Sequence, residues 1–397
     1  MAGVYISYPF CAQKCTYCNF ASGVLPEALR TPYADALRAE IRATEWPWTP
    51  ETVYLGGGTP SQMDVDALAD LLREIPGLPW SEATMEAAPG GITREKAEAW
   101  RRAGINRVSL GVQSFVQREL ARTGRKHTAE IVAQEVVVLR EAGIANFNID
   151  LIAGLPGQSA ESWAESLAWV ERLEAPHVSV YMLEVDQDSR LGAEVLAFGE
   201  RYGARDIPGD DAIAGFYETA VERLAAMGVA RYEISNFARP GQESRHNLKY
   251  WLREPYLGFG ADAHSFDVGQ DFILGRLLKP AARAGDKPGA GYKPAAGCKP
   301  APHESGHAGW RWSNVETAAE YVDRLAKGES PVAEYSPADP VAEGFFLGLR
   351  LDRGIEKTSD EKIGRFVRDG LLEDNGSRVR LTPRGVLLSN EVFAAFV

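Results

Sequence analysis

The sequence predicts an α/β protein whose first two thirds form a whole or partial (β/α) barrel. From the N-terminus to about residue 235, short β-rich runs alternate with longer helical stretches. Strands that alternate with helices of roughly 10–15 residues are typical of βαβ units around a parallel sheet. Glycine-rich or polar segments follow several of the runs, and α/β barrels place their chemistry at this end of the strands.

The individual elements follow from local composition. The predicted strands are rich in β-branched and aromatic residues, and they cover Val4–Tyr8, Thr52–Leu55, Thr84–Ala87, Arg107–Gly111, Asn146–Ile152, Val178–Leu183 and Arg231–Ile234. The predicted helices cover Tyr33–Thr44, Val65–Glu74, Arg94–Ala103, Ala129–Ala142, Glu161–Leu173 and Ile213–Met227. Gly104, Gly143 and Gly228 follow three of these helices, and glycine commonly ends a helix.

After residue 235 the alternation stops, which divides the chain into a barrel (1–235), a connecting region (236–335) and a C-terminal domain (336–397). Within the connecting region, residues 276–308 repeat Lys-Pro among Gly and Ala, a composition that cannot bury a core. We expect a flexible insertion there, with a metal or heme contact by Cys298, His303 and His307 as the alternative.

The C-terminal domain is predicted to be an α+β unit similar to a winged helix. A helix is predicted at Val315–Lys327, just before this domain. Within it, helices are predicted at Pro340–Leu351 and Thr358–Arg368, followed by a strand at Arg378–Leu381 and a final helix to Val397. Winged helices often bind DNA, but this segment lacks a strong basic excess. A substrate lid or a partner-docking module is the favoured interpretation.

Composition narrows the class further. The net charge is −12, from 43 basic and 55 acidic residues, which argues against a general nucleic-acid binder. No apolar run approaches the roughly 20 residues of a transmembrane helix, although a peripheral membrane contact is compatible with the sequence. The chain begins at Met1 and enters a strand directly, so we expect no signal peptide and a cytoplasmic location.

The most informative motif is Cys11-x3-Cys15-x2-Cys18. Cysteine thiolates hold iron–sulfur clusters, and a cubane needs four ligands, so three would leave one iron open to a small molecule. Zinc or buried structural thiols are the alternatives. Zinc would need a fourth ligand nearby, yet the nearest histidine is His127 and the only other cysteine is Cys298. A disulfide would leave one of the three cysteines over.

Further polar positions fall at the same predicted end of the strands. Gly56-Gly57-Gly58-Thr59-Pro60 follows the second strand, Glu86 ends the third, Gln113 follows the fourth and Asp150 lies in the fifth. Each alone is better explained as a turn or a hydrogen-bonded core residue. Together they indicate one functional rim.

These motifs together resemble the radical S-adenosylmethionine (SAM) superfamily. The nearest resemblance is to the branch of oxygen-independent coproporphyrinogen III oxidase and its heme-chaperone relatives. It covers nearly the whole chain except roughly 276–308, and it rests on Tyr5–Cys18, Gly56–Ser61, Arg107–Phe115, Asp150–Gly157 and Tyr256–Ser265.

The resemblance implies a role for each of these motifs. Cys11, Cys15 and Cys18 would hold a [4Fe–4S] cluster, and SAM would chelate its open iron. A reduced cluster, supplied with an electron by a flavodoxin or ferredoxin, would cleave SAM to methionine and a 5′-deoxyadenosyl radical. The positions that match SAM contacts in the family are Tyr5, Tyr17, Gly57, Gly58, Thr59, Glu86, Gln113, Arg125 and Asp150.

Two departures separate this chain from the decarboxylase. Phe20 stands where the decarboxylase has a further cysteine, and only ten residues precede Cys11. The segment His246-Asn-Leu-Lys-Tyr250-Trp251 fits the H-N-x-x-Y-W pattern of heme-binding members. Histidine is a standard ligand of heme iron, and aromatic side chains can pack on a macrocycle. Alternatively this segment caps a helix and fills core, and His264 is expected to be a packed histidine.

The resemblance therefore implies a heme carrier of the radical SAM type that passes heme to acceptor hemoproteins. The alternative is an enzyme, either a coproporphyrinogen III decarboxylase or another radical SAM catalyst on a tetrapyrrole-like substrate. The sequence leaves open whether the chain catalyses a reaction. A nucleic-acid-modifying radical SAM enzyme is disfavoured by the acidic balance.

Overall fold

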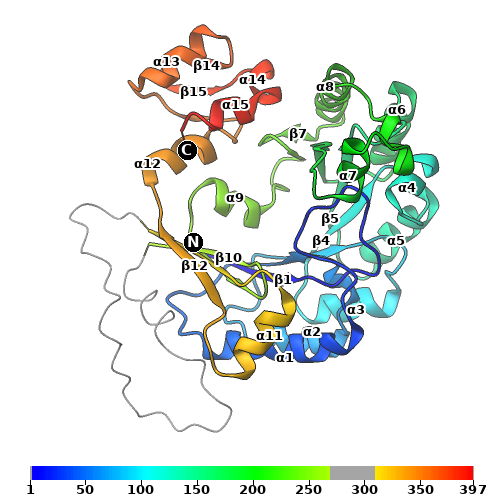
Figure 1. Cartoon of the computed structure of the whole chain (residues 1–397), viewed down its shortest axis with the longest axis vertical. Helices are drawn as coiled ribbons and strands as arrows, with labels where there is room; N and C mark the ends of the chain where they lie inside the picture. The colour runs from blue at the N-terminus through cyan, green and yellow to red at the C-terminus, as the bar shows by residue number, and fades with distance from the viewer. Residues whose placement is uncertain (1, 269–308, 397) are drawn as a thin grey trace.

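The computed structural model describes residues 2–268 and 309–396 (Figure 1). The predicted insertion at 276–308, with Cys298, His303 and His307, lies outside the described residues and stays a prediction. No helix in the described part of the chain is long and apolar enough to cross a membrane.

Six parallel strands form the centre of the main sheet, and each pairs with the next along the chain. They are β1 (Gly3–Tyr8), β2 (Thr52–Gly57), β3 (Glu82–Ala87), β4 (Arg107–Gln113), β5 (Asn146–Ala153) and β6 (His177–Met182). The predicted parallel sheet is thus confirmed. The six predicted strands each differ from the observed ones by no more than two residues at either end.

Shorter strands extend both edges of this parallel centre. On one side β9 (Tyr256–Phe259) runs parallel to β1, and the antiparallel strands β10 (His264–Asp267), β11 (Trp310–Asn314) and β12 (Val332–Pro337) follow. On the other side β8 (Asn236–Ala238) and β7 (Ala230–Arg231) pair antiparallel. In the part of the chain that the structure describes, the order β12-β11-β10-β9-β1-β2-β3-β4-β5-β6-β8-β7 ends at β12 and β7, which do not pair with each other, so the barrel is partial.

The strand predicted at Arg231–Ile234 is wrong in its extent. Only Arg231 belongs to β7, and the chain then turns so that β8 pairs with β6. The Glu233 carboxylate accepts hydrogen bonds from the Ser235 amide and from the Asn236 side chain. These local bonds replace strand pairing, which explains why β-rich composition failed as a guide here.

Helices lie on the outer face of the sheet (Figure 1). The predicted ones are observed as α1 (Arg30–Ala43), α2 (Val65–Arg73), α3 (Arg94–Arg102), α5 (Ala129–Glu141), α6 (Ala160–Arg172) and α8 (Asp210–Ala226). The side chains of Asp64, Thr93, Thr128 and Ser159 cap four of their N-termini. Two further helices, α4 (Gln117–Thr123) and α7 (Arg190–Leu196), were not predicted, being only seven residues each.

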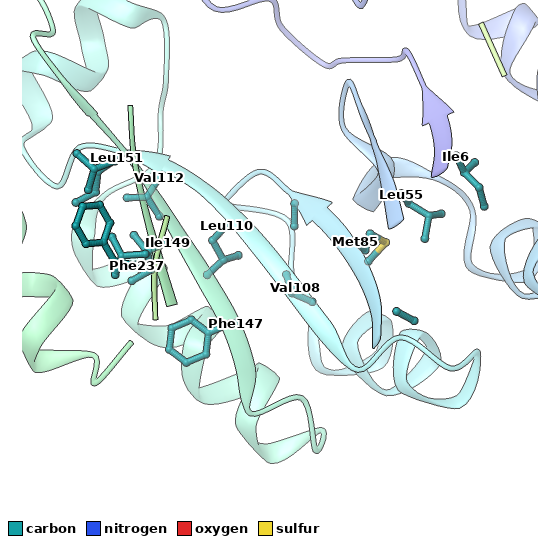
Figure 2. Close-up of a cluster of buried hydrophobic side chains, with 14 of the residues drawn as sticks. Ile6, Leu55, Met85, Val108, Leu110, Val112, Phe147, Ile149, Leu151 and Phe237 are labelled. Atoms are coloured by element: carbon teal, nitrogen blue, oxygen red, sulfur yellow. The ribbon is translucent and has the colours of Figure 1, made fainter. Parts of the chain in front are cut away.

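Side chains alternate between the two faces of each strand. In β4, Val108, Leu110 and Val112 pack in the core cluster (Figure 2). Arg107 and Ser109, in between, face the inside of the partial barrel, since successive strand residues point to opposite faces. The helix-facing side is therefore apolar, and the inner side holds the polar residues of the candidate site.

The chain ends in a small α+β domain, as predicted. It contains α12 (Pro340–Gly348), β13 (Ile355–Glu356), α13 (Glu361–Arg368), β14 (Leu372–Asp374), β15 (Arg378–Leu381), α14 (Pro383–Leu387) and α15 (Ser389–Phe393), and α11 (Ala318–Ala326) precedes it. Its three strands pair in the order β13-β15-β14. The final helix predicted to Val397 is two short helices, because the chain breaks at Leu388.

Glu343 of α12 fastens this domain to the main sheet. Its buried carboxylate binds Arg311 of β11 at 2.6 Å and Arg253 at 2.6 Å. Both guanidinium groups also lie over the Phe266 ring, at 4.7 and 4.9 Å from its centre. Burial opposes the negative charge, yet hydrogen bonds from Arg311 and Arg253 lower the pKa of Glu343 below its usual value.

We expect Glu343→Gln to destabilise the protein, because it leaves two partly buried guanidinium groups without their anion. Breaking a buried ion pair from one side costs about 3–5 kcal/mol, and partial exposure of Arg311 reduces this to roughly 2–3 kcal/mol. The free energy of urea unfolding at pH 7 measures the loss. Since a lowered carboxyl pKa stabilises the fold above the unfolded value, the difference between the two proteins should shrink as pH falls through the folded pKa.

Glu373→Gln is the matched control. Glu373 pairs with Arg380 on the surface of the same domain, where an ion pair contributes about 1 kcal/mol or less. Equal unfolding free energies for the two variants would contradict the proposed importance of Glu343.

Candidate functional site

The three cysteines lie together on the loop after β1, at the carboxyl end of the parallel strands. All three thiols are partly exposed, and burial raises the pKa of the Cys18 thiol. The Cys11 amide donates to Gly23 O at 2.8 Å, and the Leu191 amide of α7 donates to Thr16 O at 2.8 Å. Within residues 2–268 and 309–396, no group of three His, Cys, Asp or Glu side chains is arranged to hold a single metal ion.

The glycine-rich segment after β2 lies against this loop. The Gly58 amide donates to Tyr8 O and the Thr59 amide to Phe10 O, each at 2.9 Å. A Cβ on Gly58 would come within 2.8 Å of the backbone of Tyr8 and Pro9. Only glycine permits this approach. These two amide bonds tie the glycine segment to the backbone of the cysteine loop.

Two partly buried carboxylates face the inside of the barrel below the glycine segment. Glu86 accepts a hydrogen bond from Tyr54 Oη at 2.9 Å, and burial together with the charge of Asp150 raises its pKa to about 7. Burial also raises the pKa of Asp150, although Asn148 and Ser109 donate to it at 2.7 and 3.2 Å. The two carboxylates are therefore held in place by hydrogen bonds and are poorly solvated. Such a pair is suited to binding hydroxyl or cationic groups of a ligand.

Three buried polar atoms near this rim have no hydrogen-bond partner among the described residues: Tyr17 Oη, Gln113 Oε1 and Arg125 Nε. Gln113 also has a left-handed backbone with φ 72°. A Cβ on Gly111 would lie 3.3 Å from Gln113 Nε2 and 3.5 Å from Arg125 Nη2, so these two side chains flank a face that glycine leaves open. Unpaired buried polar atoms are costly, and a polar ligand would satisfy them.

The residues predicted to contact SAM thus gather at one end of the barrel. The phenol of Tyr5 completes the group, because a Cβ on Gly56 would lie 3.1 Å from both Tyr5 Oη and Glu86 Oε1. This donor set fits a cluster on three thiols and a polar nucleoside-type ligand beside it. The [4Fe–4S] cluster would bring redox chemistry, and the surrounding side chains would orient the ligand.

Several polar residues of the same interior were missing from the sequence prediction. Tyr54, Ser109 and Asn148 hold the two carboxylates by hydrogen bonds. Each lies two residues before a predicted position or glycine of the same strand, namely Gly56, Gly111 and Asp150. The period of two in a strand was the signal that could have found them.

His246 lies at the other, amino end of the barrel, on α9 (Arg245–Trp251). This imidazole is fully buried, with Nδ1 2.9 Å from Thr52 Oγ1 and Nε2 2.8 Å from Tyr250 Oη. It also stacks on the Tyr54 ring. Burial, together with the charges of Lys249 and Arg107, lowers its pKa to about 3, so the ring is neutral. Both ring nitrogens are engaged in this conformation, and neither is free for an iron.

The rest of the H-N-x-x-Y-W segment is also engaged in packing. Ser244 caps α9, and the Trp251 ring lies 4.3 Å from the Arg350 guanidinium of the C-terminal domain. The helix therefore lies between β2 and α12, inside the opening of the barrel (Figure 1). His264 was expected to be packed, but its imidazole is exposed, at the start of β10 and 4.0 Å from Asp262.

Comparison with known proteins places this geometry in a family. The model of the Radical SAM superfamily matches residues 5–170, and that of the HemN C-terminal domain matches residues 335–388. Heme chaperone HemW of Bacillus subtilis is 32% identical over 422 residues, which cover 100% of this chain and 99% of that protein. The HemW protein of Mycobacterium tuberculosis strain H37Rv is 33% identical over 98% of this chain and 93% of its own.

A solved structure agrees with the fold. Coproporphyrinogen III oxidase (HemN) from Escherichia coli, a radical SAM enzyme, aligns with a TM-score of 0.75 over 100% of this chain and 89% of its own, at 19% identity. This likeness concerns the fold alone. The domain matches and the full-length similarity confirm the resemblance that the motifs indicated. Membership in the radical SAM superfamily implies a [4Fe–4S] cluster and SAM. The chain belongs to this superfamily and, within it, to the HemW family.

Proposed function

We propose that this protein binds heme and transfers it to acceptor hemoproteins in the cytoplasm. The observation that carries the proposal is full-length similarity to proteins named heme chaperones, combined with the H-N-x-x-Y-W segment at 246–251. Phe20 supports it as well: its exposed ring stands on the cysteine loop where the decarboxylase has a further cysteine.

At the carboxyl end, Cys11, Cys15 and Cys18 would hold the [4Fe–4S] cluster. SAM would lie between the glycine segment and the two carboxylates. Carbonyl oxygens at Gly57, Gly58 and Thr59 would accept from its amino group, and Arg125 would pair with its carboxylate. Asp150 and Glu86 would accept from ribose hydroxyls, while Tyr5, Tyr17 and Gln113 would line the pocket. A flavodoxin or ferredoxin would reduce the cluster.

At the amino end, His246 would provide the ligand to heme iron. Its Nε2 is now bound by the Tyr250 hydroxyl, so heme binding requires α9 to shift or Tyr250 to rotate. The neutral state of the ring favours coordination, because a protonated imidazole cannot bind iron. Cargo binding is thus proposed to be coupled to movement of the helix that joins the barrel to the C-terminal domain.

A second candidate is a radical SAM enzyme on a tetrapyrrole-like substrate. It is favoured by the unpaired polar atoms of Tyr17, Gln113 and Arg125, which form a built ligand site rather than a remnant. Under the first proposal, the same site serves assembly or regulation. Heme binding and SAM cleavage can be measured on the same preparation and decide between them.

Replacing any one of Cys11, Cys15 or Cys18 by serine is expected to abolish the cluster. The reconstituted wild-type protein should contain about four irons and four sulfides per chain, with the broad visible absorbance of such clusters. Cys298→Ser, the control, should retain both. Stoichiometric zinc without sulfide in the wild-type protein would overturn the cluster and favour the zinc site.

Asp150→Asn is expected to weaken SAM binding about 10–100-fold while leaving the iron content unchanged. A hydrogen bond to a charged group contributes about 1.5–3 kcal/mol, and the amide cannot accept two hydroxyls equally well. Anaerobic equilibrium dialysis measures the affinity. Asp188→Asn, on an exposed neighbouring loop, is the control, and unchanged affinity in both variants would remove Asp150 from the site.

An anaerobic heme titration followed by absorbance tests the ligand. Wild-type protein should bind one heme per chain, and His246→Ala should lose this binding. Tyr250→Phe, which removes only the hydroxyl on Nε2, should bind roughly fivefold more tightly, the equivalent of about 1 kcal/mol for one hydrogen bond. This second variant separates ligand loss from misfolding.

His264→Ala is the matched control, since among the described histidines this is the one with an exposed imidazole. Heme binding that is lost in His264→Ala and kept in His246→Ala would assign the iron ligand to His264 and overturn the assignment to His246. Absence of saturable binding in every protein would favour the enzyme.

A further inference from the structure

A cavity of about 500 Å³ opens at the amino ends of β3, β5 and β6, away from the cysteines. Its wall includes Glu82, Asn146, Arg239, Gln242, Glu243 and Arg245. Arg239, Gln242 and Glu243 belong to the turn between β8 and α9, and Arg245 is the first residue of α9, directly before His246. The cavity therefore adjoins the segment in which the heme ligand is proposed, although none of its residues was assigned a role above.

Two cations of this wall are not neutralised. Arg239 and Arg245 are exposed, and neither guanidinium group forms an ion pair or hydrogen bond with any residue in 2–268 or 309–396. A hydrogen bond from the Gln242 amide to Arg239 O, at 2.9 Å, closes the turn between them. The turn that carries Arg239 and the first residue of α9, Arg245, thus both line the cavity.

The buried carboxylate of the wall, Glu82, does not neutralise these cations. Glu82 accepts from the amides of Arg245 and His246 at 2.9 and 3.0 Å, and from Ser244 Oγ at 3.3 Å. Both of its oxygens are therefore used to hold the start of α9. Glu243, the other acidic residue of the wall, forms no ion pair with Arg239 or Arg245 in the described chain.

A third guanidinium group lies behind the cavity. Arg107 is 2% exposed, and within the described residues its side chain has no ion pair, while its Nε is buried without an acceptor. It pairs in register with Asn146, whose buried Oδ1 also lacks a donor. Arginine stays charged in proteins, so a third positive charge stands on the strand next to Asn146 of the cavity wall.

We infer that this cavity binds the two carboxylate groups of a tetrapyrrole, with Arg239 and Arg245 each pairing with one of them. The inference rests on the proposed function. Heme carries two propionates on one edge, and guanidinium groups recognise carboxylates through paired, charge-assisted hydrogen bonds. Arg245 directly precedes His246, so anchoring the propionates here holds the macrocycle beside α9 while His246 is released from Tyr250.

The test compares heme with heme dimethyl ester, in which both carboxylates are masked. Affinities of both are measured for wild-type protein and for the double variant Arg239→Gln/Arg245→Gln, under anaerobic conditions. Wild-type protein should prefer heme about tenfold or more, since one charge-assisted pair of this kind is worth at least that factor. In the double variant the ratio of the two affinities should fall to near one, with ester affinity unchanged.

Arg201→Gln/Arg205→Gln is the control, because it removes two guanidinium groups beside α7, at the opposite end of the barrel. Loss of the preference in this control, or its persistence in Arg239→Gln/Arg245→Gln, would overturn the inference while leaving the proposed function intact. Absence of binding by both heme and its ester would overturn the proposed function itself.

Two competitors then identify the source of the carboxylates. Succinate and inorganic phosphate are added to wild-type protein during the heme titration. Competition only at concentrations far above that of heme is the result expected for a propionate site. Competition by either anion at concentrations similar to heme would show a general anion site and overturn the assignment to a tetrapyrrole.

Discussion

The carboxylate of Glu82 fixes α9 inside the opening of the barrel, and much of the structure depends on this contact. It binds Ser244, Arg245 and His246 at the start of the helix. From that fixed start, His246 reaches Thr52 on one side and Trp251 reaches Arg350 on the other. One buried acid thus couples the inner face of the sheet to the C-terminal domain.

The inside of the partial barrel divides into two polar ends. The carboxyl end gathers the cysteine loop, the glycine segment and the carboxylates of Glu86 and Asp150. The amino end holds α9, its buried imidazole and a group of arginines. Tyr54 joins the two ends, because its hydroxyl donates to Glu86 while its ring stacks on His246. A shift of α9 would therefore change the surroundings of Glu86 at the carboxyl end through the side chain of Tyr54.

Much of this arrangement could be predicted from the sequence, for clear physical reasons. The alternation of strands and helices in the sequence predicts the long βα units. The spacing of Cys11, Cys15 and Cys18 is set by the chemistry of the cluster. The edge strands were missed because they are short and depend on partners distant in the chain, such as β9 on β1. Arg107 and Asn148 were missed because the role of a polar residue on the inner face depends on contacts with residues of other strands.

His246 marks another limit of the sequence. Its pattern predicted a heme ligand with helix capping and packing as the alternative, and pattern alone says nothing of what surrounds a ring. The surroundings consist of Thr52, Tyr54 and Tyr250, which come from separate parts of the chain. The burial of the imidazole and the hydrogen bonds on both of its nitrogens depend on the tertiary structure. Heme binding at His246 therefore depends on a movement as well as on the identity of the residue.

The bonds between the glycine segment and the cysteine loop have a consequence for the cluster. Gly58 and Thr59 hold the carbonyls of Tyr8 and Phe10, and Cys11 is tied to Gly23, all without help from the thiols. The path of the loop is therefore fixed by backbone hydrogen bonds, which offset part of the conformational entropy lost in ordering it. In small zinc domains, by contrast, the metal must offset the cost of ordering the chain. Here backbone hydrogen bonds to neighbouring segments supply that order, so the three thiols are left to serve the cluster alone.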